Sequence, residues 1–248
     1  MKAPEMKAAM SAKTPMVGVS IMFSSPQLVE MIAALGFDWV LIDCEHGSID
    51  LSNLEVMAIA AKAAGITAIA RPPSNSSIDI MRVMDRGVDG VQVPHIKSQK
   101  EAKAAVESVK FHPLGNRGLA VGTRPSNYGI GVELDQYSKT SNLDSIVVLQ
   151  IEDREAIENL DDILSVADVD VFFVGPSDLS QSLGHPGKAN KPPVSTAITK
   201  IFRSISEAGL TSGTASSEKQ MEKAKKEGCC YLYTHLNNVL KLGAENYL

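Results

Sequence analysis

The chain has 248 residues, a length that fits either two small domains or one large one. Hydrophobic residues make up 44% of it and charged residues 21%, so it can bury an ordinary globular core. The formal net charge of −5 argues against a broadly basic surface, and we therefore expect neither nucleic acid nor an anionic membrane as a partner. A small anionic substrate remains compatible with this charge, because one local arginine can bind it.

The cysteines and the first residues predict a cytoplasmic protein. Cys44, Cys229 and Cys230 form an odd set, and adjacent cysteines do not ordinarily bridge each other, so no disulfide framework is expected. A reducing compartment such as the cytoplasm fits this use of cysteine. The first 15 residues interleave charged residues with alanine and lack the apolar core of a signal peptide. The apolar stretch 57–70 is too short to span a bilayer.

Strand and helix patterns alternate along the whole chain. The first helix is predicted to begin at Pro26 and to end at Gly36, and a later helix opens with a capping-box pattern of Ser98 and Glu101. A glycine-rich loop is expected at 113–131. The predicted strand–helix pairs are 16–23 with 26–36, 39–45 with 51–65, 67–73 with 77–87, 90–95 with 98–111, 145–151 with 154–166, 169–175 with 196–209, 210–217 with 218–228, and 229–236 with 237–248.

Eight such pairs, with no linker or charge run between the two halves, predict an α/β fold: a (β/α)8 TIM barrel that forms a single domain over residues 1–248. A doubly wound open sheet would normally carry a glycine-rich phosphate turn after its first strand, and this chain has Ser-Ser-Pro-Gln at 24–27 instead. The seventh and eighth strands are the least regular, because 210–217 is polar and 229–236 could also start a helix.

Polar residues stand at four of the predicted strand ends. The second strand ends in a run that includes Asp43, Glu45 and His46, and the third ends in Arg71. The fifth ends in Gln150 and Glu152, and the sixth in Ser177 and Asp178. Because a barrel brings all its carboxyl strand ends to one mouth, these side chains should surround one pocket.

Glu152 and Asp178 predict a metal site at that mouth. Each acidic residue follows an apolar run that is typical of a strand buried on both faces. Two carboxylates suit a divalent ion such as Mg²⁺, which leaves its remaining positions to water and substrate. A simpler interpretation is that each acid only caps the helix that follows it.

Five separated segments, in one order over nearly the whole chain, resemble the class II metal-dependent pyruvate aldolases, which cleave 2-keto-3-deoxy sugar acids and 4-hydroxy-2-oxoheptanedioate. The segments are FDWVLIDCEHGSID, ARPPSNSSIDIMRVMDRGVDGVQVPH, HPLGNRG, QIEDREAIENLDDIL and FFVGPSDLSQSLGHPG. The resemblance implies reversible retro-aldol cleavage of a 4-hydroxy-2-oxo acid to pyruvate and an aldehyde. The last two strands, in contrast, are more polar and aromatic than in this family.

The resemblance also implies a role for each matching residue. Glu152 and Asp178 would be ligands of Mg²⁺, Mn²⁺ or Co²⁺. His46 would be the catalytic histidine, paired with Asp43. The substrate would contact Arg71, Gln150 and Ser177. A homo-oligomer, a hexamer built of dimers, would exchange its last helix between subunits, and Asp85 would reach a neighbour's pocket; the alternative is that this helix closes its own barrel.

Elementary chemistry agrees with this assignment. Arg71 offers planar paired donors to keto-acid oxygens, and His46 can accept the proton of the C4 hydroxyl, unless a water molecule that it positions does so. A Schiff-base mechanism would need a lysine inside the barrel, and the predicted strand cores contain none. The remaining alternatives are a citrate-lyase-like enzyme, an oxaloacetate-decarboxylating enzyme, and a binding protein without catalysis.

Overall fold

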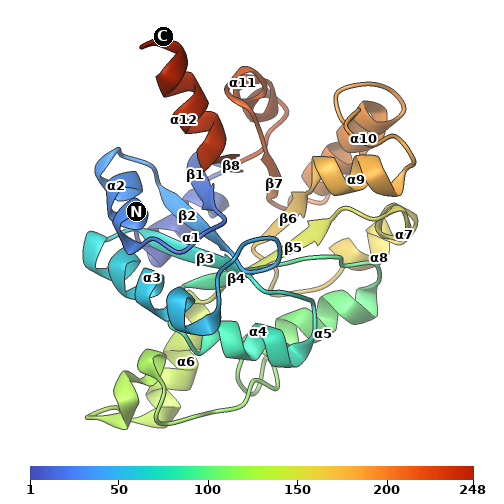
Figure 1. Cartoon of the computed structure of the whole chain (residues 1–248). Coiled ribbons are helices and arrows are strands. Elements are labelled where there is room, and N and C mark those ends of the chain that lie inside the picture. Colours follow the sequence, from blue (N-terminus) through green and yellow to red (C-terminus); the bar gives the residue numbers. More distant parts are fainter.

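The computed structural model describes residues 1–248 as a closed barrel of eight parallel strands, in the order in which they occur along the chain. This confirms the predicted (β/α)8 TIM barrel (Figure 1). The strands are β1 (Met16–Ile21), β2 (Trp39–Asp43), β3 (Thr67–Arg71), β4 (Gly90–Val93), β5 (Ile146–Ile151), β6 (Val171–Val174), β7 (Ser212–Ala215) and β8 (Tyr231–His235).

Helices surround the barrel and extend the predicted set. They are α1 (Ala3–Ser11), α2 (Pro26–Ala34), α3 (Leu51–Ala64), α4 (Ser77–Met84), α5 (Gln99–Val109), the 3-10 helix η1 (Arg124–Gly129), α6 (Leu134–Asp144), α7 (Arg154–Glu158), α8 (Leu160–Leu164), α9 (Pro176–Ser182), α10 (Val194–Glu207), α11 (Glu218–Lys226) and α12 (Leu236–Glu245). The sequence patterns did not predict α1, η1, α6 or α9, and they predicted α7 and α8 as one helix. None of these helices has the length and apolar character required to cross a membrane.

Local capping fixes where the helices that follow the early strands begin. Ser25, Asp50, Ser76 and Ser98 each accept a hydrogen bond from the backbone N–H three residues later, which satisfies one of the free donors of the first turn. Gly65 ends α3 in the left-handed conformation, with φ of 70°. The chain therefore turns from strand to helix within a few residues, and the strand ends stay close together.

Aspartates at the start of three alternate strands tie neighbouring strands together. Asp38 before β2, Asp89 before β4 and Asp170 before β6 each accept, at 2.8 Å, the N–H of the second residue of the preceding strand. Those strands are β1, β3 and β5, so the same contact recurs around the barrel. It satisfies strand N–H groups at the amino end, where the ladder is incomplete.

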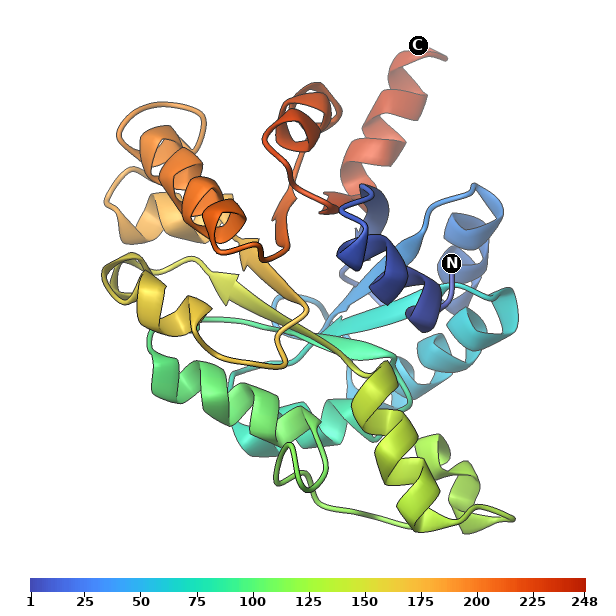
Figure 2. The same cartoon turned by 180° about the vertical axis from the view of Figure 1, so that it is seen from behind.

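The barrel interior is filled by aromatic side chains and closed at its amino end by α1 (Figure 2). Trp39 packs on Tyr231 with a centroid distance of 4.1 Å, and Phe173 stacks on Tyr233 at 5.3 Å. Gly213 of β7 leaves room for this group, because a Cβ there would lie 2.8 Å from a ring carbon of Tyr231. The small residues of the seventh strand are thus complementary to the aromatic residues of the eighth, which explains why both look unlike ordinary barrel strands.

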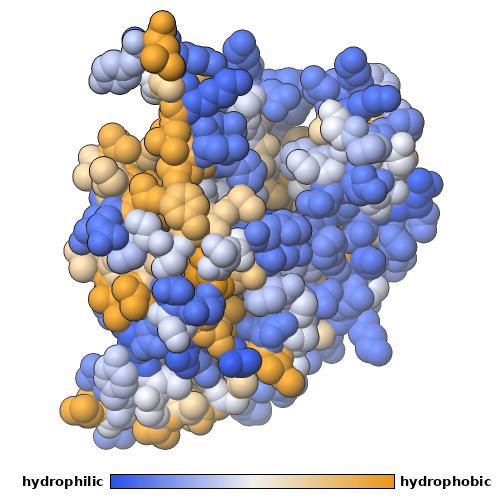
Figure 3. Space-filling model, viewed as in Figure 1, coloured by the Kyte–Doolittle hydropathy of each residue, from blue (hydrophilic) through white to orange (hydrophobic).

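The last helix stands apart from the barrel. α12 buries no residue and extends away from the strands toward the carboxyl terminus (Figure 1). Leu240 and Leu242 are exposed on it, and Met31 and Leu35 are exposed on or beside α2. Figure 3 shows apolar side chains gathered along α12 and on the flank below it. The helix does not fold back to cover its own barrel.

Candidate active site at the carboxyl end of the barrel

An ion pair joins the carboxyl ends of β2 and β3. Asp43 and Arg71 are register partners at the last positions of these strands. Arg71 donates from Nε to Asp43 Oδ1 at 2.9 Å and from Nη2 to Oδ2 at 2.5 Å, and its Nη1 lies 3.2 Å from Glu45 Oε2. Burial opposes the charge of Asp43, but the hydrogen bond and charge of Arg71 prevail and lower the pKa of Asp43. Arg71 is therefore held rigidly at the mouth.

The same carboxylate ends β2 and positions His46. Asp43 Oδ1 accepts the backbone N–H groups of Glu45 at 3.1 Å and His46 at 3.2 Å, which turns the chain out of the strand. The His46 side chain is 52% exposed, and its Nε2 lies 3.8 Å from Glu45 Oε2. Asp43 thus contacts His46 through the backbone, and its side chain pairs with Arg71 rather than with the imidazole.

Glu152 lies at the end of a buried hydrogen-bond relay across the barrel. Tyr231 donates to Gln92 Oε1 at 3.0 Å, and Gln92 donates in turn to Gln150. Gln150 Nε2 then lies 2.7 and 2.8 Å from the two carboxylate oxygens of Glu152. Burial raises the pKa of Glu152, while the N–H of His95 and the Gln150 amide favour its ionised form. The relay fixes the orientation of this carboxylate.

Asp178 lies near Glu152 in the first turn of α9. Glu152 is packed so closely against Gly175, the residue before that helix, that a Cβ there would lie 2.3 Å from Glu152 Oε2. The charge of Asp178 contributes to the raised pKa of Glu152, and no basic side chain lies within 4.0 Å of either Asp178 or, apart from His95, Glu152. The chain holds no cluster of three His, Cys, Asp or Glu ligands.

These observations fit a hard divalent ion. Two carboxylates that follow neighbouring strands match the Mg²⁺ pattern, in which water and substrate oxygens supply the other ligands. Zinc would instead favour three or four nitrogen or sulfur ligands, which the mouth lacks. Ser177, predicted to contact substrate, is exposed on the same turn of α9.

His95 follows β4 and contacts residues of the candidate site; the sequence placed it at a strand end but assigned it no role. It has a φ of 53°, a left-handed conformation, and its Nδ1 lies 3.0 Å from Asp153 Oδ2. Its Nε2 lies 3.4 Å from Glu45 Oε1, and its backbone N–H donates to Glu152 Oε1 at 3.0 Å. Partial burial lowers the pKa of His95, but Asp153, Glu152 and Glu45 outweigh it and raise the pKa overall. His95 therefore connects the Glu152 relay with the group formed by Arg71, Asp43 and Glu45, which we call the Arg71 cluster.

Position along the strands could have identified some of the other missed residues. Glu45 stands at a strand end beside predicted site residues, so the rule that selected Asp43 and His46 also applies to it. Gln92 and Tyr231 lie inside strands at inward-facing positions. Only the pairing of β4 with β5, and the hydrogen bond that Tyr231 of β8 makes to Gln92 across the barrel, reveal that they support Glu152.

The only buried lysine is far from the mouth. Lys110 caps α5 at the amino end of the barrel, and its Nζ donates to the backbone oxygens of Asn142 at 2.7 Å and Ser145 at 2.9 Å. Burial lowers its pKa to about 8. The lysine that a Schiff-base mechanism requires is therefore not positioned among the site residues.

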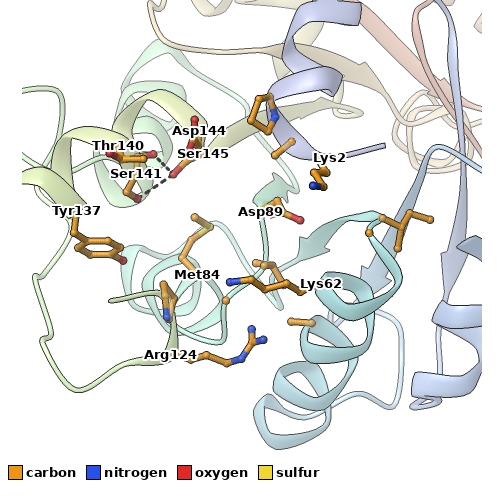
Figure 4. Close-up of a pocket in the computed structure, with 18 of the residues that line it drawn as sticks. Lys2, Lys62, Met84, Asp89, Arg124, Tyr137, Thr140, Ser141, Asp144 and Ser145 are labelled. Atoms are coloured by element: carbon orange, nitrogen blue, oxygen red, sulfur yellow. Dashed lines mark hydrogen bonds between the residues drawn. The ribbon is translucent and has the colours of Figure 1, made fainter. Parts of the chain in front are cut away.

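A separate cavity also lies at the amino end. It measures about 530 Å³ and is lined by Lys62 at the end of α3, Asp89 before β4, and Arg124 in η1 (Figure 4). These positions precede the strands, whereas Glu152 and Asp178 follow them. The cavity is thus separate from the carboxylate site.

Comparison with known proteins agrees with the geometry of the mouth. The pattern of the HpcH/HpaI aldolase/citrate lyase family matches residues 17–231. A hydroxypyruvate/pyruvate aldolase of Sagittula stellata is 32% identical over 221 residues, which cover 89% of this chain and 86% of that protein. A 5-keto-4-deoxy-D-glucarate aldolase of Shigella boydii is 35% identical over 207 residues, covering 84% and 79%.

Solved structures show the same relationship. The crystal structure of a family protein from Burkholderia cenocepacia superposes with a TM-score of 0.91 and 26% identity, covering 98% of this chain and 96% of that one. A citrate lyase beta subunit from M. tuberculosis is more distant, with a TM-score of 0.59 and 14% identity over 92% and 93%, which shows a similar fold alone. The chain belongs to the HpcH/HpaI aldolase/citrate lyase family, and it is a carbon–carbon lyase of the aldolase type.

Proposed function

We propose that the chain cleaves a 4-hydroxy-2-oxo acid reversibly into pyruvate and an aldehyde, with a divalent ion held by Glu152 and Asp178. The observation that carries this proposal is the buried Glu152 carboxylate, fixed by Gln150 and placed near the charge of Asp178, with His95 as the only basic side chain within 4.0 Å of the two carboxylates. Mg²⁺, Mn²⁺ and Co²⁺ are the candidate ions. When bound, such an ion would stabilise negative charge on the keto oxygen of the substrate.

Arg71 is arranged to bind the keto acid. Asp43 engages two of the five N–H donors of the guanidinium, on Nε and Nη2. The remaining donors lie on the side of Glu45, whose Oε2 is 3.2 Å from Nη1, and a carboxylate or keto oxygen of the substrate would bind there in competition with Glu45. Since Asp43 fixes the guanidinium plane, little side-chain freedom is lost when the substrate binds.

His46 is placed to accept a proton. In the cleavage direction the C4 hydroxyl loses its proton and becomes the aldehyde carbonyl, while the electron pair of the C3–C4 bond passes into the keto acid and is protonated at C3. His46 is exposed at the mouth and 3.8 Å from the nearest carboxylate oxygen, whereas three carboxylates favour the protonated form of His95. We therefore assign the C4 proton to His46, acting directly or through one water molecule.

The decisive experiment is pyruvate release from a panel of 4-hydroxy-2-oxo acids. EDTA should abolish the release, and added Mg²⁺, Mn²⁺ or Co²⁺ should restore it. Glu152→Gln and Asp178→Asn should remove both the activity and its metal dependence, while Asp162→Asn, at an exposed carboxylate of α8, should retain both. Full activity in excess chelator, or trapping of a substrate adduct by borohydride, would overturn the proposal.

We also propose a cytoplasmic homohexamer in which α12 is exchanged between subunits. Support comes from the three cysteines, all free and buried, and from the unburied apolar side chains of α12. Asp85, which by resemblance would reach a neighbour's pocket, is 2.7 Å from Arg117 in its own chain. The pair would enter such an interface together.

A further inference from the structure

Two buried polar atoms beside the active site have no partner. Ser20 Oγ and His235 Nδ1 are enclosed, and neither has a hydrogen-bond partner. Buried polar groups are nearly always paired, so an unpaired group near the carboxyl end of the barrel indicates a position where a ligand or water supplies the missing bond. Ser20 and His235 are also register partners on β1 and β8, so the two atoms belong to one place in the barrel.

Both side chains belong to the inward-facing set. Met16 of β1 and Tyr231 and Tyr233 of β8 are in the interior core, and side chains alternate along a strand, so Ser20 and His235 point the same way one layer higher. The His235 ring packs edge-on against Tyr233 at a centroid distance of 5.5 Å. This packing holds the imidazole in place.

The pair adjoins the Arg71 cluster, on the side away from Glu152. β1 is hydrogen-bonded to β2, whose last residue is Asp43, and the charges of Asp43 and Arg71 both act on His235. Burial and the Arg71 charge lower the pKa of His235, so the imidazole is neutral near pH 7 and offers one donor and one acceptor nitrogen. The Ser20 hydroxyl likewise donates and accepts.

This chemistry suits an uncharged hydroxyl group. A hydroxyl can donate to one member of the pair and accept from the other, so it satisfies both unpaired atoms at once. A carboxylate can only accept, and here it would lie near the Asp43 carboxylate, while the Arg71 charge is already shared by Asp43 and Glu45.

We propose that Ser20 and His235 form a hydroxyl-binding subsite, which selects substrates whose aldehyde portion carries an uncharged hydroxyl group beside the reacting carbonyl. The proposal rests on the proposed aldolase function and assigns to it two residues that determine which aldehyde portion the site prefers. Neither residue lies in the five segments that resemble the aldolases.

The test compares two aldehydes that differ by one hydroxyl group. In the addition direction, with pyruvate and added Mg²⁺ or Mn²⁺, the intact enzyme should have a higher kcat/KM for glycolaldehyde than for acetaldehyde. Ser20→Ala and His235→Phe should each lower this ratio roughly tenfold, mainly through the KM for glycolaldehyde. His235→Asn keeps a donor and an acceptor and should restore much of the preference. Thr234→Val, on the outward face of β8, should leave the ratio unchanged.

A reaction without aldehyde separates this proposal from the proposed function. Exchange of the pyruvate methyl protons with deuterated water needs only the keto-acid half of the site, so it should persist within about twofold in all four variants. If Ser20→Ala still exchanges the pyruvate methyl protons and its ratio of kcat/KM for glycolaldehyde over acetaldehyde is unchanged, the subsite is overturned and the proposed aldolase function stands. No exchange by the intact, metal-supplied enzyme would instead overturn the proposed function. Ser20→Ala removes a single atom, so the test stands even if His235→Phe does not fold.

Discussion

Asp43 has two tasks at the residue scale, since it ends β2 and also holds Arg71. Removing its charge would leave a nearly buried guanidinium with Glu45 as its only carboxylate partner. We expect Asp43→Asn to lower the free energy of unfolding by about 3 kcal/mol, because breaking a buried ion pair leaves an uncompensated charge. Urea unfolding at pH 7 measures this, with Asp50→Asn at the exposed start of α3 as the control.

The pH dependence of that difference follows from the lowered pKa of Asp43. The unfolded state binds a proton at higher pH than the folded state does, so the stabilisation is present above about pH 4 and is lost as the pH falls through the folded pKa. The difference in the free energy of unfolding between wild type and Asp43→Asn should therefore become smaller below pH 4. A difference that stays constant down to pH 3 would show that Asp43 acts by packing alone.

His46 provides the second prediction at this scale. We proposed His46 as the proton acceptor, and its ring makes no hydrogen bond, so it should affect turnover far more than stability. His46→Ala should lower kcat by ~10²–10⁴-fold, with little change in the urea midpoint. Steady-state kinetics with pyruvate and an aldehyde measure the loss. Unchanged turnover would mean that the histidine is structural.

The buried Lys110 links the end of α5 to the segment that connects α6 with β5. Its pKa of about 8 lies below that of an unfolded lysine, so above pH 8 the unfolded state binds more protons and this group adds stability as the pH rises toward 10. The stability of wild type relative to Lys110→Met should increase by on the order of 2 kcal/mol between pH 7 and 10. Urea unfolding at the two pH values tests the sign.

The complementarity between β7 and β8 gives a prediction at the element scale. Gly213→Ala would place a Cβ 2.5 Å from the backbone carbonyl oxygen of Tyr231 and 2.8 Å from a carbon of its ring. Neither the strand backbone nor the packed ring can move freely. We expect a loss of about 1–3 kcal/mol by overpacking. Gly122→Ala, in an open loop with no heavy atom near the new Cβ, is the matched control and should change stability by less than about 0.5 kcal/mol.

The sequence predicted the regular elements better than the unusual ones. Apolar runs identified the strands from β1 to β6, because strands buried on both faces consist of such residues. The helix α6 was missed, since Asn142 is its only buried residue and it shows little apolar periodicity. At the site, strand ends identified Asp43, Arg71 and Glu152. Ser20 and His235 could not be found in this way, because their importance depends on the register between β1 and β8.

At the scale of the whole molecule, the chain leaves one apolar surface uncovered. The leucines Leu240 and Leu242 of α12 are exposed, as are Met31 and Phe23 on and before α2. Figure 3 shows apolar side chains gathered along α12 and on the flank below it. Monomeric proteins rarely expose a contiguous apolar surface of this kind. A symmetric oligomer would cover it with the same surface of a second copy, and an exchanged helix is one such arrangement.

Truncation and charge substitution of α12 test this assembly. The intact chain should be an oligomer by light scattering, with a mass that indicates six subunits. A chain that ends at His235, and the double variant Leu240→Asp with Leu242→Asp, should both shift to a smaller mass, because burying the new charges in an apolar interface is unfavourable. Asn237→Asp, on an exposed position of the same helix, controls for added charge. A monomeric intact chain, or a truncated chain that keeps the full oligomeric mass, would show that α12 is not exchanged.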